Sequence, residues 1–441
     1  MGVRLFGQIR NKVFGSKLIG SFFVTVIGSG ISKFLMIIST FVCTHYLTLT
    51  EFGEFSFIRN TLTMILTICA LNFSSLCTKF TSEIKKSEDS LYKLILLFFF
   101  SFLMCLIAGL LLLLLPADFL KGLLGENKNV IVYFRIAGLL IPLFMLQPLI
   151  EGVMRGMMLF KLIGVTQVFS SLLYIITVIG GIKIKGINGA IYGLYTYYLI
   201  YSVSLFFLVM KQNNIKSLNF LNYTAIVDVI PVLYKLIIPV FIISFVEAPV
   251  FWYLQALLTK YSDISSVGCM TVMKQIRNFA VLIPNYFFNT YLAFAAALVA
   301  DKKYNDYFKQ LNKIIRIFSI IGICLFLLFT FCGKYILGLY GDEYAEKFSS
   351  LIYSNACIPL VMIISLIKTE LILQEHQRYL LFVSIVWNLL WVVIFYILVK
   401  ASFKVLDSFF IAELVSVFVN LVLIYIVYRI DKVKLVCKRI I

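Results

Sequence analysis

Basic side chains inside long apolar stretches are the residues of this sequence best suited to chemistry. A charged side chain near the middle of the bilayer costs about 3 kcal/mol unless it faces a partner or a water-filled cavity. Arginine suits bidentate contact with phosphate oxygens, and lysine supplies a point charge. On helices these residues predict a cationic cavity that holds a diphosphate group. They are Lys33, Arg59, Lys274 and Arg277.

A structural interpretation of the same residues stays open. Lys33 can pair with a buried acid, while Arg59 and Lys274 can extend to the membrane interface, where the long side chain keeps its charge in water. Lys274 and Arg277 are three residues apart, so a helix places them on one face. That shared face favours the cavity.

Two acidic residues also lie near the middle of apolar stretches, Glu247 and Glu413. One interpretation is that they bind protons or cations and couple an ion gradient to transport. The other is that they neutralise Lys33 or Arg277, or stay protonated because burial disfavours the charged carboxylate. The sequence leaves both interpretations open.

The sequence predicts neither an enzyme site nor a metal or cofactor site. Its two histidines, His45 and His376, have no Cys, Asp or Glu at metal-ligand spacing. Neither a Walker A sequence nor a G-x-G-x-x-G motif opens any segment, so we expect no nucleotide cofactor. The nine cysteines contain no C-x-x-C pair and are expected to be free thiols.

The composition indicates which class of protein holds these residues. Of 441 residues, 61% are apolar and 14% are charged, against about half and about a quarter in a soluble domain. Only a polytopic membrane protein hides so much apolar surface, which excludes a soluble enzyme, a secreted disulfide module and a disordered tail. The net charge of +18 therefore reflects membrane topology, and we expect no nucleic acid partner.

Apolar runs divide the chain into twelve expected membrane-spanning helices, so the fold class is all-α. With the N-terminus in the cytoplasm, the inside loops hold most of the 39 basic residues, which predicts that both termini are cytoplasmic. The first apolar run is too long for a signal peptide and should remain as a helix. The expected spans are 17–46, 53–77, 93–115, 130–150, 160–182, 187–210, 236–258, 267–300, 314–331, 348–373, 380–399 and 405–428.

The two halves of the chain resemble each other in sequence, and their matched positions are separated by a nearly constant number of residues. This predicts two pseudo-symmetric six-helix bundles, residues 1–215 and 216–441, repeated in parallel about an axis along the membrane normal. Two such bundles leave a cleft that suits alternating access better than a pore. The matched positions are Gly125 with Gly341, Pro142 with Pro359, and Asn60 with Asn278.

Three stretches carry a resemblance to a known family. THYLTLTEFGEFSFIRN, which opens residues 44–83, GVMRGMMLFKLIGVTQVFSSLLYI at residues 152–175, and Gly-Asp-Glu-Tyr at residues 341–344 resemble Wzx-type polysaccharide-unit flippases. These belong to the multidrug/oligosaccharidyl-lipid/polysaccharide (MOP) exporter superfamily. The sequence departs from the family pattern at Asn72, where members commonly carry Gly.

The resemblance implies a function and a location. It implies two six-helix lobes in the bacterial inner membrane that move an undecaprenyl-diphosphate-linked oligosaccharide, such as an O-antigen unit, from the cytoplasmic to the periplasmic leaflet. The implied partners are membrane lipids, a polysaccharide polymerase and a chain-length regulator. It also implies basic residues in the first, second and eighth helices, where Lys33, Arg59, Lys274 and Arg277 lie.

Other functions compete with this one. A cation-coupled multidrug exporter of the same superfamily should line its cavity with acids and aromatic residues, whereas the deep residues here are mainly basic. An O-antigen polymerase or ligase is disfavoured by the short loops. The related peptidoglycan-precursor flippases typically carry two additional helices, which 441 residues do not accommodate.

Overall fold

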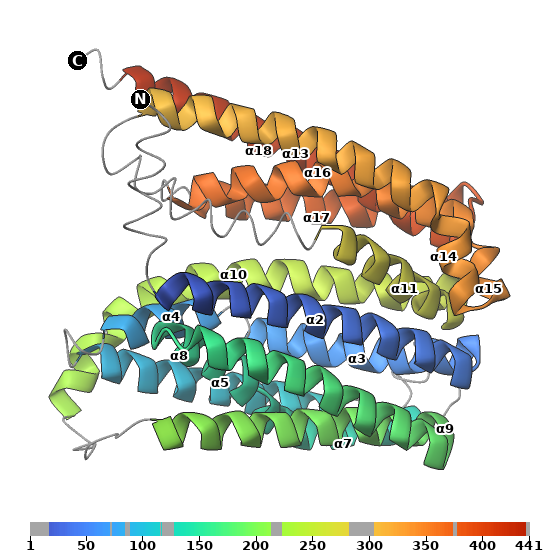
Figure 1. Cartoon of the computed structure of the whole chain (residues 1–441), viewed down its shortest axis with the longest axis horizontal. Coiled ribbons are helices and arrows are strands. Elements are labelled where there is room, and N and C mark those ends of the chain that lie inside the picture. The colour runs from blue at the N-terminus through green and yellow to red at the C-terminus, as the bar shows by residue number, and fades with distance from the viewer. Residues whose placement is uncertain are drawn as a thin grey trace. The chain divides into compact units, whose positions relative to one another are not determined.

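The computed structural model describes residues 17–70, 73–83, 89–114, 116, 128–212, 223–281, 304–373 and 377–437. Within these ranges the chain forms helices and short turns, and no strand is present (Figure 1). The helices are α2 (Lys17–Tyr46), α3 (Leu49–Cys69), α4 (Ser74–Glu83), α5 (Asp89–Leu114), α7 (Lys128–Phe144), α8 (Leu146–Gly156), α9 (Phe160–Gln212), α10 (Tyr223–Tyr261), α11 (Ser265–Ala280), α13 (Tyr304–Phe331), α14 (Gly333–Tyr340), α15 (Asp342–Ala345), α16 (Phe348–Leu373), α17 (Gln377–Lys400) and α18 (Val405–Cys437).

These helices confirm the expected all-helical membrane fold. Eight helices among the described residues are long and apolar enough to cross a membrane. Helix α9 covers two expected spans, 160–182 and 187–210. Its backbone leaves the helical conformation between them, at Lys185 and at Gly186, whose φ of 58° suits glycine. The expected span 267–300 begins as α11, and residues 282–300 lie outside the described residues, as does Asn72.

The helices pack into two compact units. Unit 1 comprises Met1–Tyr46, Ile58–Lys121 and Asn127–Phe241, and unit 2 comprises Leu47–Phe57, Gly122–Glu126 and Ile242–Ile441. Helices α3 and α10 therefore begin in one unit and end in the other. The predicted lobe bounds, 1–215 and 216–441, stay a prediction.

Unit 1 is built on close helix–helix contacts. Helix α2 packs along α9, and α5 packs on α7. A Cβ atom placed at Gly28 of α2 would lie 2.6 Å from the backbone oxygen of Gly164 in α9. Small residues allow such close approach, which is how helices gain van der Waals contact when lipid supplies no hydrophobic driving force.

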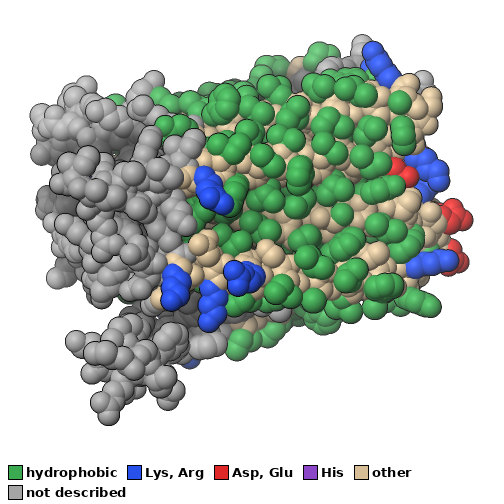
Figure 2. Space-filling model, turned by 90° about the horizontal axis from the view of Figure 1, so that it is seen from above, with side chains coloured by type: hydrophobic (Ala, Val, Ile, Leu, Met, Phe, Trp, Pro, Cys, Tyr) green, Lys and Arg blue, Asp and Glu red, His purple; other side chains and the backbone are tan. Residues whose placement is uncertain are grey.

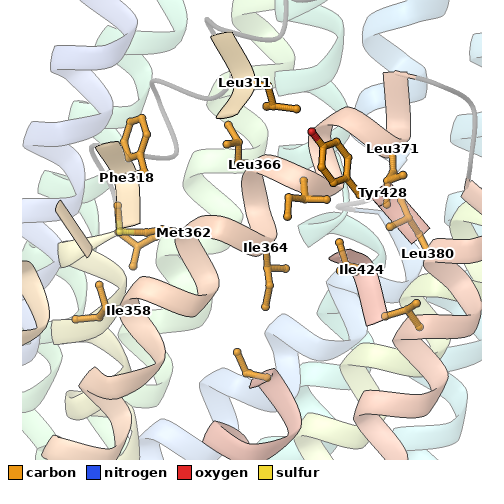
Figure 3. Close-up of a cluster of buried hydrophobic side chains, with 14 of the residues drawn as sticks. Leu311, Phe318, Ile358, Met362, Ile364, Leu366, Leu371, Leu380, Ile424 and Tyr428 are labelled. Carbon is orange, nitrogen blue, oxygen red and sulfur yellow. The ribbon is translucent and has the colours of Figure 1, made fainter. Parts of the chain in front are cut away.

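Unit 2 is organised around α16. Helices α11, α13, α14, α17 and α18 all contact it. Its buried side chains meet those of α13, α17 and α18 in one cluster, in which Ile358 and Met362 of α16 are fully buried (Figure 3). Pro359 lies inside α16, and Gly322 of α13 faces it. A Cβ atom added at Gly322 would lie 2.7 Å from the Cα of Pro359. The proline therefore sits where the neighbouring helix has no side chain.

The outer surface suits a lipid environment. On the face drawn in Figure 2, hydrophobic side chains cover the lengths of the helices, and charged side chains gather toward the helix ends. Large apolar residues such as Leu114, Ile176 and Phe331 are more than two-thirds exposed. Such a surface is stable in hydrocarbon and unstable in water.

The glycine contact of unit 1 has a matched control on the same helix. We expect Gly28→Ala to lower the thermal unfolding midpoint in detergent, because its Cβ overlaps the α9 backbone. An added Cβ at Gly30 meets nothing within 4 Å. Gly30→Ala should keep or raise the midpoint, since alanine favours a helix over glycine by about 1 kcal/mol. Equal midpoints for the two variants would contradict the close packing of α2 on α9.

Candidate functional site

A buried ion cluster in unit 2 contains three of the residues that the sequence singled out. Glu413 of α18 is 5% exposed and Arg277 of α11 is 8% exposed. The guanidinium donates two hydrogen bonds to the carboxylate, Nη1 to Oε2 at 3.0 Å and Nη2 to Oε1 at 2.8 Å. The Nζ of Lys274 lies 3.2 Å from the same Oε1. One carboxylate therefore serves two cations.

Helix α11 places both cations on the carboxylate. It is a short helix that contacts α16, and its last turn carries Arg277, near the negative end of the helix dipole. The three-residue spacing brings Lys274 onto the same face, one turn earlier. Glu413 approaches from α18, which also packs on α16. The cluster thus ties α11 to α18.

An aromatic cage surrounds the ammonium of Lys274. Its Nζ lies 3.9 Å from the ring centre of Phe251, 4.9 Å from that of Trp391 and 5.4 Å from that of Phe409. Trp391 donates from Nε1 to the backbone oxygen of Phe409 at 3.3 Å, which orients its ring. Aromatic faces stabilise a desolvated cation. The cage explains how a second cation is held beside a carboxylate that Arg277 already engages in both oxygens.

Buried polar atoms on the part of α16 that contacts the cluster lack partners within the described chain. These are Oγ of Ser354 and both side-chain polar atoms of the adjacent Asn355. Ser354 and Asn355 are fully buried on α16, and the backbone oxygen of Ser354 lies 3.5 Å from Nη1 of Arg277. Buried polar atoms are nearly always hydrogen-bonded. This wall of the cluster is therefore suited to water or to a polar ligand.

Glu247 lies in the same unit but outside the cluster. Its Oε1 accepts a hydrogen bond from Ser384 of α17 at 2.8 Å and lies 3.8 Å from Nζ of Lys368 of α16. The Glu247 side chain is 38% exposed. The pairing of Glu247 with Lys368 was not predicted from the sequence. Of the two acids, then, Glu413 pairs with both cations of the cluster and Glu247 is accessible.

Lys33 and Arg59 belong to unit 1. Lys33 is exposed on α2. Arg59 is half-buried on α3, and its Nη1 donates to the hydroxyl of Tyr174 at 3.4 Å. A cavity shared by these two residues with Lys274 and Arg277 stays a prediction.

Tyrosines extend the Arg59 contact into the interior of unit 1. The ring of Tyr174 meets that of Tyr197 edge-on, and Tyr197 stacks on Tyr201. The hydroxyl of Tyr201 donates to Oε1 of Glu151 at 3.2 Å. All three tyrosines are at most 5% exposed, so they join helices in the interior of unit 1. Sequence reasoning passed over Glu151, which lies one residue beyond the expected span 130–150.

Within the described ranges, no group of three His, Cys, Asp or Glu side chains is arranged to hold a metal ion. The site that the structure does describe is an ion cluster of side chains, whose chemistry is the recognition of charge.

Sequence comparison finds no matching family model and no matching curated protein. Comparison of folds finds several transporters. An inward-facing multidrug resistance MATE family transporter of the MOP superfamily matches with a TM-score of 0.73 at 11% identity, over 95% of this chain and 99% of that one. A mutant of the Vibrio cholerae MATE transporter VcmN matches with a TM-score of 0.68 at 13% identity, over 94% and 97% of the two chains.

A third solved structure is a MOP superfamily transporter from Pyrococcus furiosus, described as having a binding pocket of reverse polarity that suggests a different function. It matches with a TM-score of 0.66 at 15% identity, over 95% of this chain and 97% of that one. Identities this low show the fold alone. The chain therefore shares the fold of these solved MOP superfamily transporters, which agrees with the all-α membrane fold that the sequence predicted.

Removal of the carboxylate from the ion cluster should lower the stability of the protein by a measurable amount. We expect Glu413→Gln to lower the free energy of unfolding by about 3 kcal/mol or more, because two buried cations then face each other without a counter-charge. Thermal or denaturant unfolding in detergent measures this loss. The double variant Glu413→Gln/Arg277→Gln should lose less than the sum of the two single losses.

Asp407→Asn serves as the control on the same helix, because Asp407 accepts hydrogen bonds from Ser349 and Ser350 and not from a cation. It should lose about 1 kcal/mol. Equal losses for Asp407→Asn and Glu413→Gln, or additive losses in the double variant, would show that the cluster is not coupled.

Proposed function

We propose that this protein is a flippase that moves an undecaprenyl-diphosphate-linked oligosaccharide from the cytoplasmic to the periplasmic leaflet of the bacterial inner membrane by alternating access. The observation that carries the proposal is the charge of the unit 2 cluster, in which two cations share one buried carboxylate. A site with surplus positive charge in a low-dielectric interior favours an anionic cargo and disfavours a cationic one. O-antigen or a similar surface polysaccharide is the class of product that the sequence resemblance supports.

Glu413 then acts as an internal stand-in for the cargo. Its carboxylate occupies both donor positions of Arg277 that a diphosphate oxygen pair would use. When the transporter opens toward the cytoplasm, a diphosphate competes with Glu413 for Arg277 and Lys274. When it opens outward, Glu413 takes both cations back and the cargo leaves. This exchange avoids a state in which the two cations are buried without an anion.

Unit 1 supplies the other cations of the proposed site. Lys33 is exposed and Arg59 is partly exposed, so their long side chains can reach a ligand. Such accessible cations suit the first contact with a charged headgroup. In this proposal they bind the diphosphate together with Lys274 and Arg277.

A cation-coupled multidrug exporter is the second candidate. It is favoured by solved structures of the same fold that are described as multidrug MATE transporters and by the accessible carboxylate of Glu247. The Pyrococcus furiosus transporter of reverse pocket polarity supports the view that this fold serves cargoes of different charge. The sign of the charge at the site separates the two candidates.

The gene product can be tested directly in its source bacterium. Deletion should remove surface polysaccharide while the lipid-linked unit accumulates on the cytoplasmic leaflet. Unchanged polysaccharide, with increased sensitivity to cationic drugs, would favour the exporter.

Arg59 tests the cationic site at a residue outside the Glu413 cluster, where its Nη1 donates a hydrogen bond to the hydroxyl of Tyr174. We expect Arg59→Gln to reduce surface polysaccharide at least tenfold at normal protein level, since a charge-assisted phosphate contact is lost. Arg135→Gln, which removes an exposed arginine of α7 in the same unit, is the control and should complement the deletion fully. Full complementation by Arg59→Gln would remove Arg59 from the site.

Glu247 is the candidate for ion coupling in this proposal. We expect Glu247→Gln in proteoliposomes to transport more slowly and to lose the dependence on a proton or cation gradient, because an amide cannot exchange a proton or balance a cation. Glu343→Gln, at an exposed acid outside the apolar spans, is the control. Wild-type rate and gradient dependence in Glu247→Gln would assign Glu247 to a structural role with Lys368.

A further inference from the structure

An apolar groove runs along the lipid-facing side of unit 2, apart from the ion cluster. Its volume is about 350 Å³. Helices α13 and α18 both pack on α16, and the groove lies over α16 between them. Its lining residues are Ile315 of α13, Ile363 and Ile367 of α16, and Leu421, Val422, Tyr425 and Ile426 of α18.

The bottom of the groove is buried and apolar, and its sides are exposed. Ile367 is fully buried and forms part of the core cluster, whereas Val422 and Ile426 are 42% and 48% exposed. All three helices are among those able to cross a membrane. In a bilayer these walls face hydrocarbon, so the occupant of the groove is a hydrocarbon chain and not a polar solute.

One end of the groove carries a positive charge. Arg429, the last residue of the α18 span, donates from Nε to the hydroxyl of Tyr425 at 3.0 Å, and its guanidinium lies 5.3 Å from the centre of the Tyr425 ring. Tyr425 also lines the groove. This contact holds the arginine at the groove mouth and leaves its terminal nitrogens to donate to a phosphate. Exposed Lys313 and Arg316 flank Ile315 at the corresponding end of α13.

The depth of the groove fits one leaflet. Leu421 lies about 12 Å along the helix axis from Arg429 at 1.5 Å per residue, within about half of the hydrocarbon thickness. The predicted topology places Arg429 at the cytoplasmic surface. An acyl chain can therefore lie in the groove while its phosphate meets Arg429.

We propose that this groove is a binding site for an anionic phospholipid of the cytoplasmic leaflet, with one acyl chain over Ile367 and the phosphate on Arg429. The site lies within unit 2 and does not depend on the cargo proposed above. Basic pockets between membrane helices on the cytoplasmic side favour anionic headgroups over zwitterionic ones.

Photo-crosslinking in proteoliposomes tests the proposal. The probe is phosphatidylglycerol with a diazirine in the middle of one acyl chain, and labelled peptides are mapped by mass spectrometry. We expect labels within residues 363–367 and 421–426, and weaker labelling by a phosphatidylcholine probe of the same chains. Equal labelling by the two probes, or labels spread evenly over the exposed helices, would overturn the site.

Two variants with matched controls sharpen the test. Val422→Trp should fill the groove and abolish labelling, whereas Val415→Trp, at a similarly exposed valine of α18 outside the groove, should not. Arg429→Gln should reduce phosphatidylglycerol labelling about tenfold through loss of a charge-assisted contact, and Lys400→Gln should leave it unchanged. Labelling that polyprenyl phosphate displaces and excess phosphatidylglycerol does not would assign the groove to a prenyl chain and overturn the proposal.

Discussion

A carboxylate buried between helices cannot stay charged without cations, and this constraint organises unit 2. Glu413 holds Arg277 through both of its oxygens and Lys274 through one. Because the three residues come from two helices that both pack on α16, the ion cluster fixes α11 against the core. The aromatic cage around Lys274 stabilises the second cation, which leaves one surplus positive charge in a low-dielectric interior.

Local sequence pattern was enough to predict the helices. Long apolar runs in a chain of this composition have few alternatives, because lipid allows only structures that satisfy the backbone internally. The break in α9 was visible as the polar Lys183 and Lys185 around Gly186. The division of α3 and α10 between two units was not visible, because it depends on packing between distant segments.

The site was predictable in its charges and not in its pairings. Lys274 and Arg277 share a face by their spacing alone, whereas the choice between Glu247 and Glu413 as their partner depends on which helices are neighbours. The sequence left that choice open, and the structure pairs Glu413 with the cluster and Glu247 with Lys368. Phe251, Trp391 and Phe409 were passed over, since aromatic residues are common in any apolar span.

The sign of the net charge at the ion cluster decides between an anionic and a cationic cargo, and ligand binding to purified protein tests it most directly. Titration in detergent should give saturable binding of farnesyl diphosphate that weakens at high salt, as expected for phosphate held by Lys and Arg. The cationic drug analogue tetraphenylphosphonium should not bind. Saturable binding of tetraphenylphosphonium, with none of farnesyl diphosphate, would contradict the account and identify a site for cationic cargo.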